Sequence, residues 1–134
     1  MIGRPHHVVY DCPDPGALAA FYAELLGLPV TYRSDDFVVV AASGTASGYA
    51  FQLATDHRAP QWPAPEHPQQ VHLDVMVDDL VVASAAALAL GARALPGGDH
   101  VFADPAGHPF CLVGRPGWAL PVTSAPTSPD PIRG

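Results

Sequence analysis

The most regular hydrophobic pattern in the chain lies at 71–78, where apolar side chains alternate with side chains of a different kind. The apolar row comprises Val71, Leu73, Val75 and Val77, and the other row comprises His72, Asp74, Met76 and Asp78. Successive side chains of a strand point to opposite faces, so this pattern predicts a strand with one face in the core. Imidazole, carboxylate and thioether groups can bind metal, transfer protons or contact a ligand. The second face is therefore expected to line a functional site.

A similar strand is predicted near the amino terminus, over 6–12. Its alternation places His7, Val9 and Asp11 on one face and a more apolar row on the other. Like the strand at 71–78, it opens with a histidine and is followed by an apolar segment with helical spacing. The two regions are therefore expected to play corresponding roles in the fold.

The helices predicted after these strands carry matching start and stop signals. Asp14 is placed to cap the first helix, and Gly27 supplies its end. The second helix is predicted over 80–90, with Asp79 before it and Gly91 after it. The spacing from the strand-opening histidine to the helix-ending glycine is 20 residues in the first copy and 19 in the second. This agreement indicates an internal repeat.

The remaining strands complete two units of the form β-α-β-β-β. They are predicted over 29–33, 37–42 and 49–54 in the first unit, and over 93–95, 100–103 and 109–113 in the second. We expect a single domain at 1–114, divided into module one at 5–55, a linker at 56–69 and module two at 70–114.

Proline dominates the two segments outside the modules. The linker contains four prolines around Trp62, a density that excludes helix and central strand. Trp62 is expected to anchor the linker against the body of the protein, with contact to a ligand as the alternative. Residues 115–134 contain five prolines and no hydrophobic periodicity, which predicts a partly disordered tail.

Composition narrows the class of protein. The 134 residues are 49% hydrophobic and 14% charged, which is typical of a folded globular chain. The net charge is −7 and all six basic residues are scattered arginines, so a nucleic-acid partner is not expected. The apolar stretches are too short and interrupted to span a membrane, and the amino terminus lacks the apolar core of a signal peptide. With only two cysteines as well, we expect a cytoplasmic protein.

Several short motifs resemble the vicinal oxygen chelate superfamily, and in particular its glyoxalase-like domain branch. They are Asp14-Pro15, Phe21-Tyr22, Leu26-Gly27-Leu28, Gln70-Val-His-Leu-Asp74 and Asp104-Pro-Ala-Gly-His-Pro-Phe110. The superfamily includes glyoxalase I, bleomycin-resistance proteins, extradiol dioxygenases and methylmalonyl-CoA epimerase. The resemblance covers about residues 5–114. It implies an α+β fold in which two tandem βαβββ modules form a cup-shaped, curved mixed sheet, and it implies a homodimer.

The resemblance also implies positions for metal ligands. Metal-dependent relatives place one ligand on the first strand and one on the last strand of each module. The corresponding residues are His7, Gln52, His72 and Cys111. The usual glutamate ligand is missing, because Glu24 and Glu66 lie elsewhere. We therefore expect no cofactor, with a divalent ion of Zn, Ni, Fe or Mn as the alternative.

Two functional hypotheses follow, and whether the protein is an enzyme stays open between them. The first is a bleomycin-resistance-like protein that binds a small molecule in the cup without the standard metal site, through Trp62, Asp74 and Met76. The second is a metal-dependent lyase, isomerase or dioxygenase with His7 and His72 as metal ligands. In either case Asp74 is the candidate catalytic residue, as a base or as a group that orients the ligand.

Overall fold

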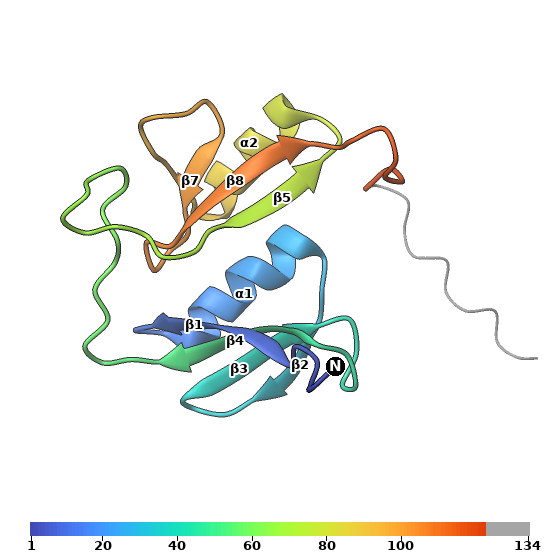
Figure 1. Ribbon diagram of the computed structural model, residues 1–134, viewed down its shortest axis with the longest axis vertical. Coiled ribbons are helices and arrows are strands. Elements are labelled where there is room, and N and C mark those ends of the chain that lie inside the picture. Colours follow the sequence, from blue (N-terminus) through green and yellow to red (C-terminus); the bar gives the residue numbers. More distant parts are fainter. Residues whose placement is uncertain (123–134) are drawn as a thin grey trace, which may run out of the picture.

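The computed structural model describes residues 1–122, which form two consecutive modules of one helix and one four-stranded sheet each (Figure 1). Module one consists of β1 (His7–Cys12), α1 (Pro15–Leu26), β2 (Val30–Arg33), β3 (Phe37–Ala41) and β4 (Gly48–Leu53). Module two consists of β5 (Leu73–Val77), α2 (Leu80–Leu90), β6 (Arg93–Ala94), β7 (Val101–Ala103) and β8 (Pro109–Gly114). The predicted β-α-β-β-β order is confirmed in both.

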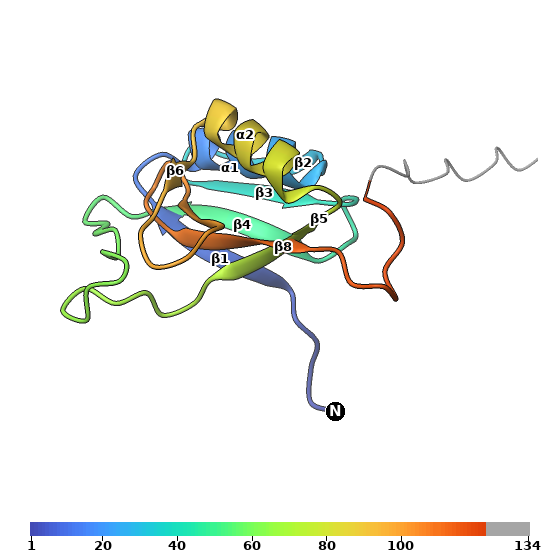
Figure 2. The ribbon, with the colours of Figure 1, turned by 90° about the horizontal axis from the view of Figure 1, so that it is seen from above.

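Each sheet is mixed, and the two have the same topology. The strand orders are β1-β4-β3-β2 and β5-β8-β7-β6, and the first strand of each module runs parallel to the last. Within the described residues no ladder joins one sheet to the other. Both helices lie on the same side of the sheets, which leaves the opposite side open (Figure 2). The first strands, β1 and β5, are edge strands and lie along the adjoining borders of the two sheets (Figure 1).

The helix boundaries follow from local hydrogen bonding. The Asp14 carboxylate accepts a hydrogen bond from the backbone N–H of Ala17, and Gly27 ends α1 with a φ of 64°. The Asp79 carboxylate accepts from two backbone N–H groups in the first turn of α2, and Gly91 ends that helix with a φ of 116°. Both glycines adopt the left-handed conformation that disfavours other residues. The predicted caps and stops are thus confirmed.

A single main core extends through both modules. Its fully buried members include Leu18, Tyr22, Phe51 and Phe110, and the apolar row of β5 joins them through Val75 and Val77. The predicted buried face of β5 is therefore confirmed within the strand. Val71, which precedes β5, is exposed. The alternation predicted a longer strand because it begins two residues before the first ladder pair, that of Leu73 with Phe110.

The proline-rich segments are held against the body where the structure describes them. The Trp62 indole Nε1 donates a hydrogen bond of 2.7 Å to the backbone oxygen of Pro96, in agreement with an anchor for the linker. Arg115 forms an ion pair of 2.6 Å with Asp78, and the backbone N–H of Val122 also donates to that carboxylate. The predicted tail is thus bound at 115–122, and its remainder, 123–134, lies outside the described residues. No helix in the described part is long and apolar enough to cross a membrane.

Candidate functional site

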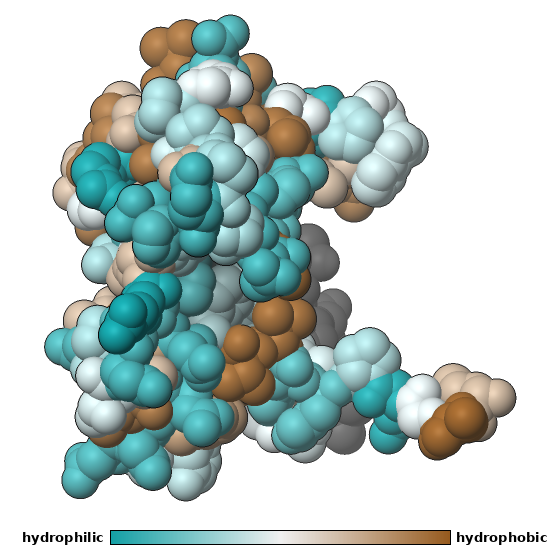
Figure 3. Space-filling model, turned by 60° about the vertical axis from the view of Figure 1, so that its left-hand side comes forward, coloured by the Kyte–Doolittle hydropathy of each residue, from teal (hydrophilic) through white to brown (hydrophobic). Residues whose placement is uncertain are grey.

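The open side of module one carries a cavity with a volume of about 1020 Å³. Its wall combines the first residues of the chain, β1, the β2–β3 hairpin and the loop at 44–47. The residues that matter for recognition are Arg4, His6, His7, Tyr32, Asp36 and Phe37. A space-filling view of the molecule shows that hydrophobic and hydrophilic groups are interspersed along its surface (Figure 3). The cavity is likewise mixed in character.

One part of this wall is aromatic. Tyr32 and Phe37 contact each other with ring centroids 6.4 Å apart and planes at 63°. Tyr32 is 56% exposed, and its ring combines an apolar face with a polar hydroxyl. The exposed ring can therefore stack on a planar ligand without displacing a core contact.

The opposite part of the wall is rich in nitrogen donors. His6 and His7 lie with ring centroids 3.9 Å apart, next to Arg4. Nδ1 of His7 accepts a hydrogen bond of 3.0 Å from the backbone N–H of Gly48. Burial and the neighbouring His6 both lower the pKa of His7, which favours the neutral ring. With Nδ1 as the acceptor, the neutral ring carries its proton on Nε2, so His7 offers a donor.

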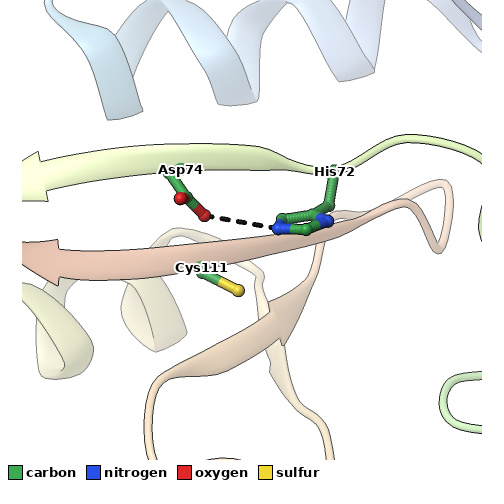
Figure 4. Close-up of side chains that lie close together, drawn as sticks. All are labelled: His72, Asp74 and Cys111. Carbon is green, nitrogen blue, oxygen red and sulfur yellow. Dashed lines mark ion pairs between the residues drawn. The ribbon is translucent and has the colours of Figure 1, made fainter.

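Module two carries a separate cluster of possible metal ligands. In the described residues, His72, Asp74 and Cys111 each offer one ligand atom, and these three atoms lie within 4.8 Å of one another. His72 Nε2 and Asp74 Oδ1 are 3.4 Å apart. Figure 4 shows the Asp74 carboxylate directed at the His72 ring, with Cys111 on the neighbouring strand. The sequence prediction that His72 and Asp74 share a face agrees with this geometry.

Strand pairing explains why Cys111 joins the cluster. In the parallel ladder of β5 and β8, Asp74 lies opposite Cys111. His72 precedes Asp74 by two residues, so its side chain points to the same side of the extended backbone. Burial raises the pKa of the Cys111 thiol, and the Asp74 carboxylate raises it further. Without an ion, Cys111 is therefore a thiol.

The structure separates the first-module members of the predicted metal set. His7 is not part of the cluster around His72. In the ladder of β1 and β4, Gly48 lies opposite His7 and Gln52 lies opposite Asp11. Gln52 thus lies four residues along β4 from Gly48, the partner of His7. The backbone positions of Gly48 and Gln52 are about 13 Å apart. That distance is too long for His7 and Gln52 to bind one ion together.

Two sets of side chains can therefore be examined as possible ligands of a metal ion. The four positions that the fold family implies do not fit one ion. His7 and Gln52, the two residues from module one, lie too far apart along the sheet to bind the same ion. The set of His72, Asp74 and Cys111 does fit, since imidazole, carboxylate and thiolate groups are all ligands of Zn²⁺. When bound, such an ion would supply a Lewis acid on the open side of module two.

The two other predicted ligand-binding residues, Trp62 and Met76, belong neither to the module-one cavity nor to the cluster of His72, Asp74 and Cys111. Trp62 is half-buried in the linker and bonded to Pro96, and it lines neither of the cavities described here. Met76 is 38% exposed on β5, two residues beyond Asp74 on the same face. Met76 therefore borders the His72 cluster.

Sequence reasoning missed Arg4 and Tyr32, which line the large cavity. Tyr32 gave no clear signal, because aromatic residues are common in strands and Tyr32 lies in a predicted strand. Arg4 gave no signal either, since its place in the wall depends on the path of the first residues.

Asp104 was missed as well, and it is the buried charged side chain of the described core. Sequence reasoning treated it only as part of a turn motif. A second, smaller cavity of about 440 Å³ lies nearby, between β1 and the linker, with His57 and His108 in its wall. His108 Nε2 donates a hydrogen bond of 2.7 Å to the backbone oxygen of Asp11, so this region joins the two modules.

Comparison with known proteins agrees with this architecture. The sequence model of the glyoxalase-like domain matches residues 7–113, so the chain belongs to that family, within the vicinal oxygen chelate superfamily. A comparison with curated proteins found no match.

Solved structures resemble the fold at low sequence identity. A glyoxalase/bleomycin resistance protein/dioxygenase family enzyme from Burkholderia phytofirmans PsJN has a TM-score of 0.61 at 17% identity, covering 81% of this chain and 95% of its own. A glyoxalase-related enzyme from Fulvimarina pelagi has a TM-score of 0.61 at 18% identity, covering 89% and 93%. The fosfomycin resistance protein FosX from Mesorhizobium loti has a TM-score of 0.55 at 15% identity, covering 84% and 91%. These similarities bear on the fold alone.

Proposed function

We propose that this protein binds a small aromatic molecule in the large cavity of module one, without the four-residue metal set of its superfamily. The observation that carries the proposal is the cavity itself, whose volume of about 1020 Å³ is at the upper end of the range for small-molecule sites. It is lined by an exposed aromatic ring and by several polar side chains, the combination that fixes the orientation of a bound ligand.

The chemistry of the wall indicates which part of a ligand lies where. Tyr32 offers a ring face for stacking, at a gain of about 0.5–1.5 kcal/mol beyond the area that is buried. Arg4 and the Nε2 group of His7 offer hydrogen-bond donors on the other side. An aromatic ring that carries a carboxylate or another acceptor group satisfies both sides.

The competing function, a metal-dependent reaction with His7 and His72 as joint ligands, has less support. His7 uses Nδ1 to accept from Gly48, and its neutral ring then holds the proton on Nε2, so neither nitrogen is free to bind an ion. The two histidines also belong to different centres, one in the cavity wall and one in the module-two cluster. These observations favour ligand binding in the cavity over a metal-dependent reaction that uses both histidines.

The test is a screen of matched aromatic carboxylates and aromatic amines against the full chain, by ligand-observed NMR followed by calorimetry. We expect the carboxylates to bind more tightly than the amines. Replacement of Tyr32 by alanine should weaken binding by roughly two- to tenfold, in keeping with the loss of one stacking contact. Arg4→Gln should abolish the preference for carboxylates, because it removes the positive charge but keeps a polar side chain.

The matched control is Val81→Ala, a truncation at a side chain that is 78% exposed on α2, away from the cavity wall. This variant should bind ligands as the unmodified chain does. The proposal would be overturned if Tyr32→Ala bound the same ligands with unchanged affinity, or if no aromatic compound of either charge bound.

A further inference from the structure

The smaller cavity, of about 440 Å³, lies between β1 and the linker and has no role in the function proposed above. We propose that it binds a small zwitterion of the kind that an apolar α-amino acid provides, with one carboxylate, one ammonium group and an aliphatic side chain. The volume lies within the range of about 300–1,000 Å³ that is usual for small-molecule sites. Of the residues that line this cavity, only Val9 also lines the module-one cavity, so the two sites differ in their chemistry.

A buried acceptor in the wall of the smaller cavity lacks a hydrogen-bond donor. It is Oε1 of Gln69, which has no partner among the described residues. An unsatisfied buried acceptor costs about 1–3 kcal/mol, and nearly all such groups in folded proteins find a donor. An N–H group of a ligand in the cavity supplies that donor.

The free edge of β1 offers backbone groups to the same ligand. The backbone oxygen of Cys12 accepts from the N–H of Ala54, directly after β4, whereas the backbone oxygen of Asp11 accepts from His108 on the other side. Backbone groups alternate in direction along a strand, so Val9, two residues before Asp11, also directs its N–H and C=O groups away from β4. Val9 therefore adds one donor and one acceptor to the wall.

Two opposite charges in the wall favour a zwitterion. Arg58 lies on the linker and Asp11 on β1, and in the described part of the chain neither side chain forms an ion pair. A guanidinium group binds a carboxylate, and a carboxylate binds an ammonium group. Apolar surface for an aliphatic side chain comes from Val8, Pro60 and Pro68.

Hydrogen bonds hold both walls in place. On the linker side, His57 Nε2 donates a hydrogen bond of 2.9 Å to the backbone oxygen of Ala106, and Trp62 ties the linker to the same module. On the strand side, His108 joins module two to the backbone of Asp11. The linker and β1 are thus both attached to module two, so little ordering of the wall is needed when a ligand binds.

The test is a calorimetric titration of the full chain with leucine and with two matched probes. Leucinamide keeps the ammonium group and lacks the carboxylate, whereas 4-methylpentanoate keeps the carboxylate and lacks the ammonium group. We expect one equivalent of leucine to bind, and to bind more tightly than either probe, because each probe leaves one charge in the wall without a partner.

Three variants assign the parts of the ligand. Arg58→Gln should weaken leucine binding by roughly two- to fivefold, as expected for an exposed charge, and leave leucinamide binding unchanged. Asp11→Asn should weaken leucine binding by a similar factor and leave 4-methylpentanoate binding unchanged. Gln69→Leu should weaken the binding of leucine and leucinamide by about tenfold or more, because it removes a buried acceptor for the ammonium group.

Two controls make the same chemical changes elsewhere. Gln61→Leu alters an exposed side chain of the linker outside the cavity wall, and it should bind leucine as the unmodified chain does. Arg4→Gln removes a positive charge from the wall of the module-one cavity, and it should also leave leucine affinity unchanged. In the absence of leucine, Gln69→Leu should unfold in urea no more easily than the unmodified chain, since it removes an unsatisfied acceptor.

Four results would overturn the proposal. Leucine could show no saturable binding, or bind no more tightly than the two probes. Gln69→Leu could bind leucine with unchanged affinity. Gln69→Leu could be less stable than the unmodified chain, which would mean that a permanent water satisfies Oε1. Finally, Arg4→Gln could lose leucine binding, which would place leucine in the module-one cavity. The proposal for aromatic ligands is tested by Tyr32→Ala, which should leave leucine binding intact, so the two proposals stand or fail separately.

Discussion

The hydroxyl of Tyr22 donates a hydrogen bond of 2.7 Å to Oδ2 of Asp104, and both side chains are buried. Tyr22 lies on α1 of module one, and Asp104 lies in the turn between β7 and β8 of module two. The other carboxylate oxygen of Asp104 accepts from the backbone N–H groups of Ala106 and His108, at 2.8 and 3.0 Å. One carboxylate thus orders a turn in its own module and binds a helix of the other.

Tyr22→Phe removes this link while it keeps the aromatic packing. The variant leaves one oxygen of a buried carboxylate without its side-chain donor, a change that costs about 1–3 kcal/mol. We expect the free energy of unfolding in urea to fall by that amount. Tyr32→Phe is the matched control, because the Tyr32 ring is 56% exposed, and it should show no change. Equal stability of Tyr22→Phe and the unmodified chain would contradict the importance of the link.

Asp104 should also make stability depend on pH. Burial raises the pKa of Asp104 above its ordinary value of 3.8, although the Tyr22 hydroxyl, the His108 ring and the backbone donors act in the opposite direction. A raised pKa means that folding favours the protonated carboxyl. Its contribution to stability is therefore fully present below pH 3.8 and declines as the pH rises through the pKa of the folded state.

The comparison with Asp104→Asn isolates this contribution, because asparagine does not titrate. Free energies of unfolding are measured for both chains at a series of pH values. We expect the stability of the unmodified chain relative to the variant to be greatest at acidic pH and to decrease toward neutral pH. An advantage that grows with pH would show that the hydrogen bonds to Asp104 outweigh its burial.

Gly48 is predicted to be intolerant of a side chain. It opens β4 and lies opposite both His7 and Ala41, and an added Cβ would overlap the backbone oxygen of Val40. Gly48→Ala should therefore lower the free energy of unfolding by about 1–3 kcal/mol, since the sheet has to shift to make room. Gly44→Ala is the matched control, because nothing lies within 4 Å of the position of its Cβ. Thermal unfolding of the two variants gives the comparison, and a similar loss in both would contradict the prediction.

The sequence by itself determined the elements and their order. Alternation showed which face of β5 enters the core, and Val75 and Val77 are buried as predicted. Asp14 and Asp79 indicated where the helices begin, and the following glycines indicated where they end. These features can be predicted from the sequence because helix capping and the direction of successive side chains depend on only a few neighbouring residues. The repeat and the short motifs then led to the correct family.

Only the tertiary structure decided which side chains meet. Asp74 joins Cys111 because of the register between β5 and β8, and Gln52 lies away from His7 because of the register between β1 and β4. Strand register over such sequence separations depends on packing throughout the sheet, and a shift of one residue reverses the face of every side chain. The contact between Tyr22 and Asp104 spans 82 residues and depends on how the modules pack. Local patterns carry no information on such distances, so the cavity and the pairing of Asp74 with Cys111 emerged only from the fold.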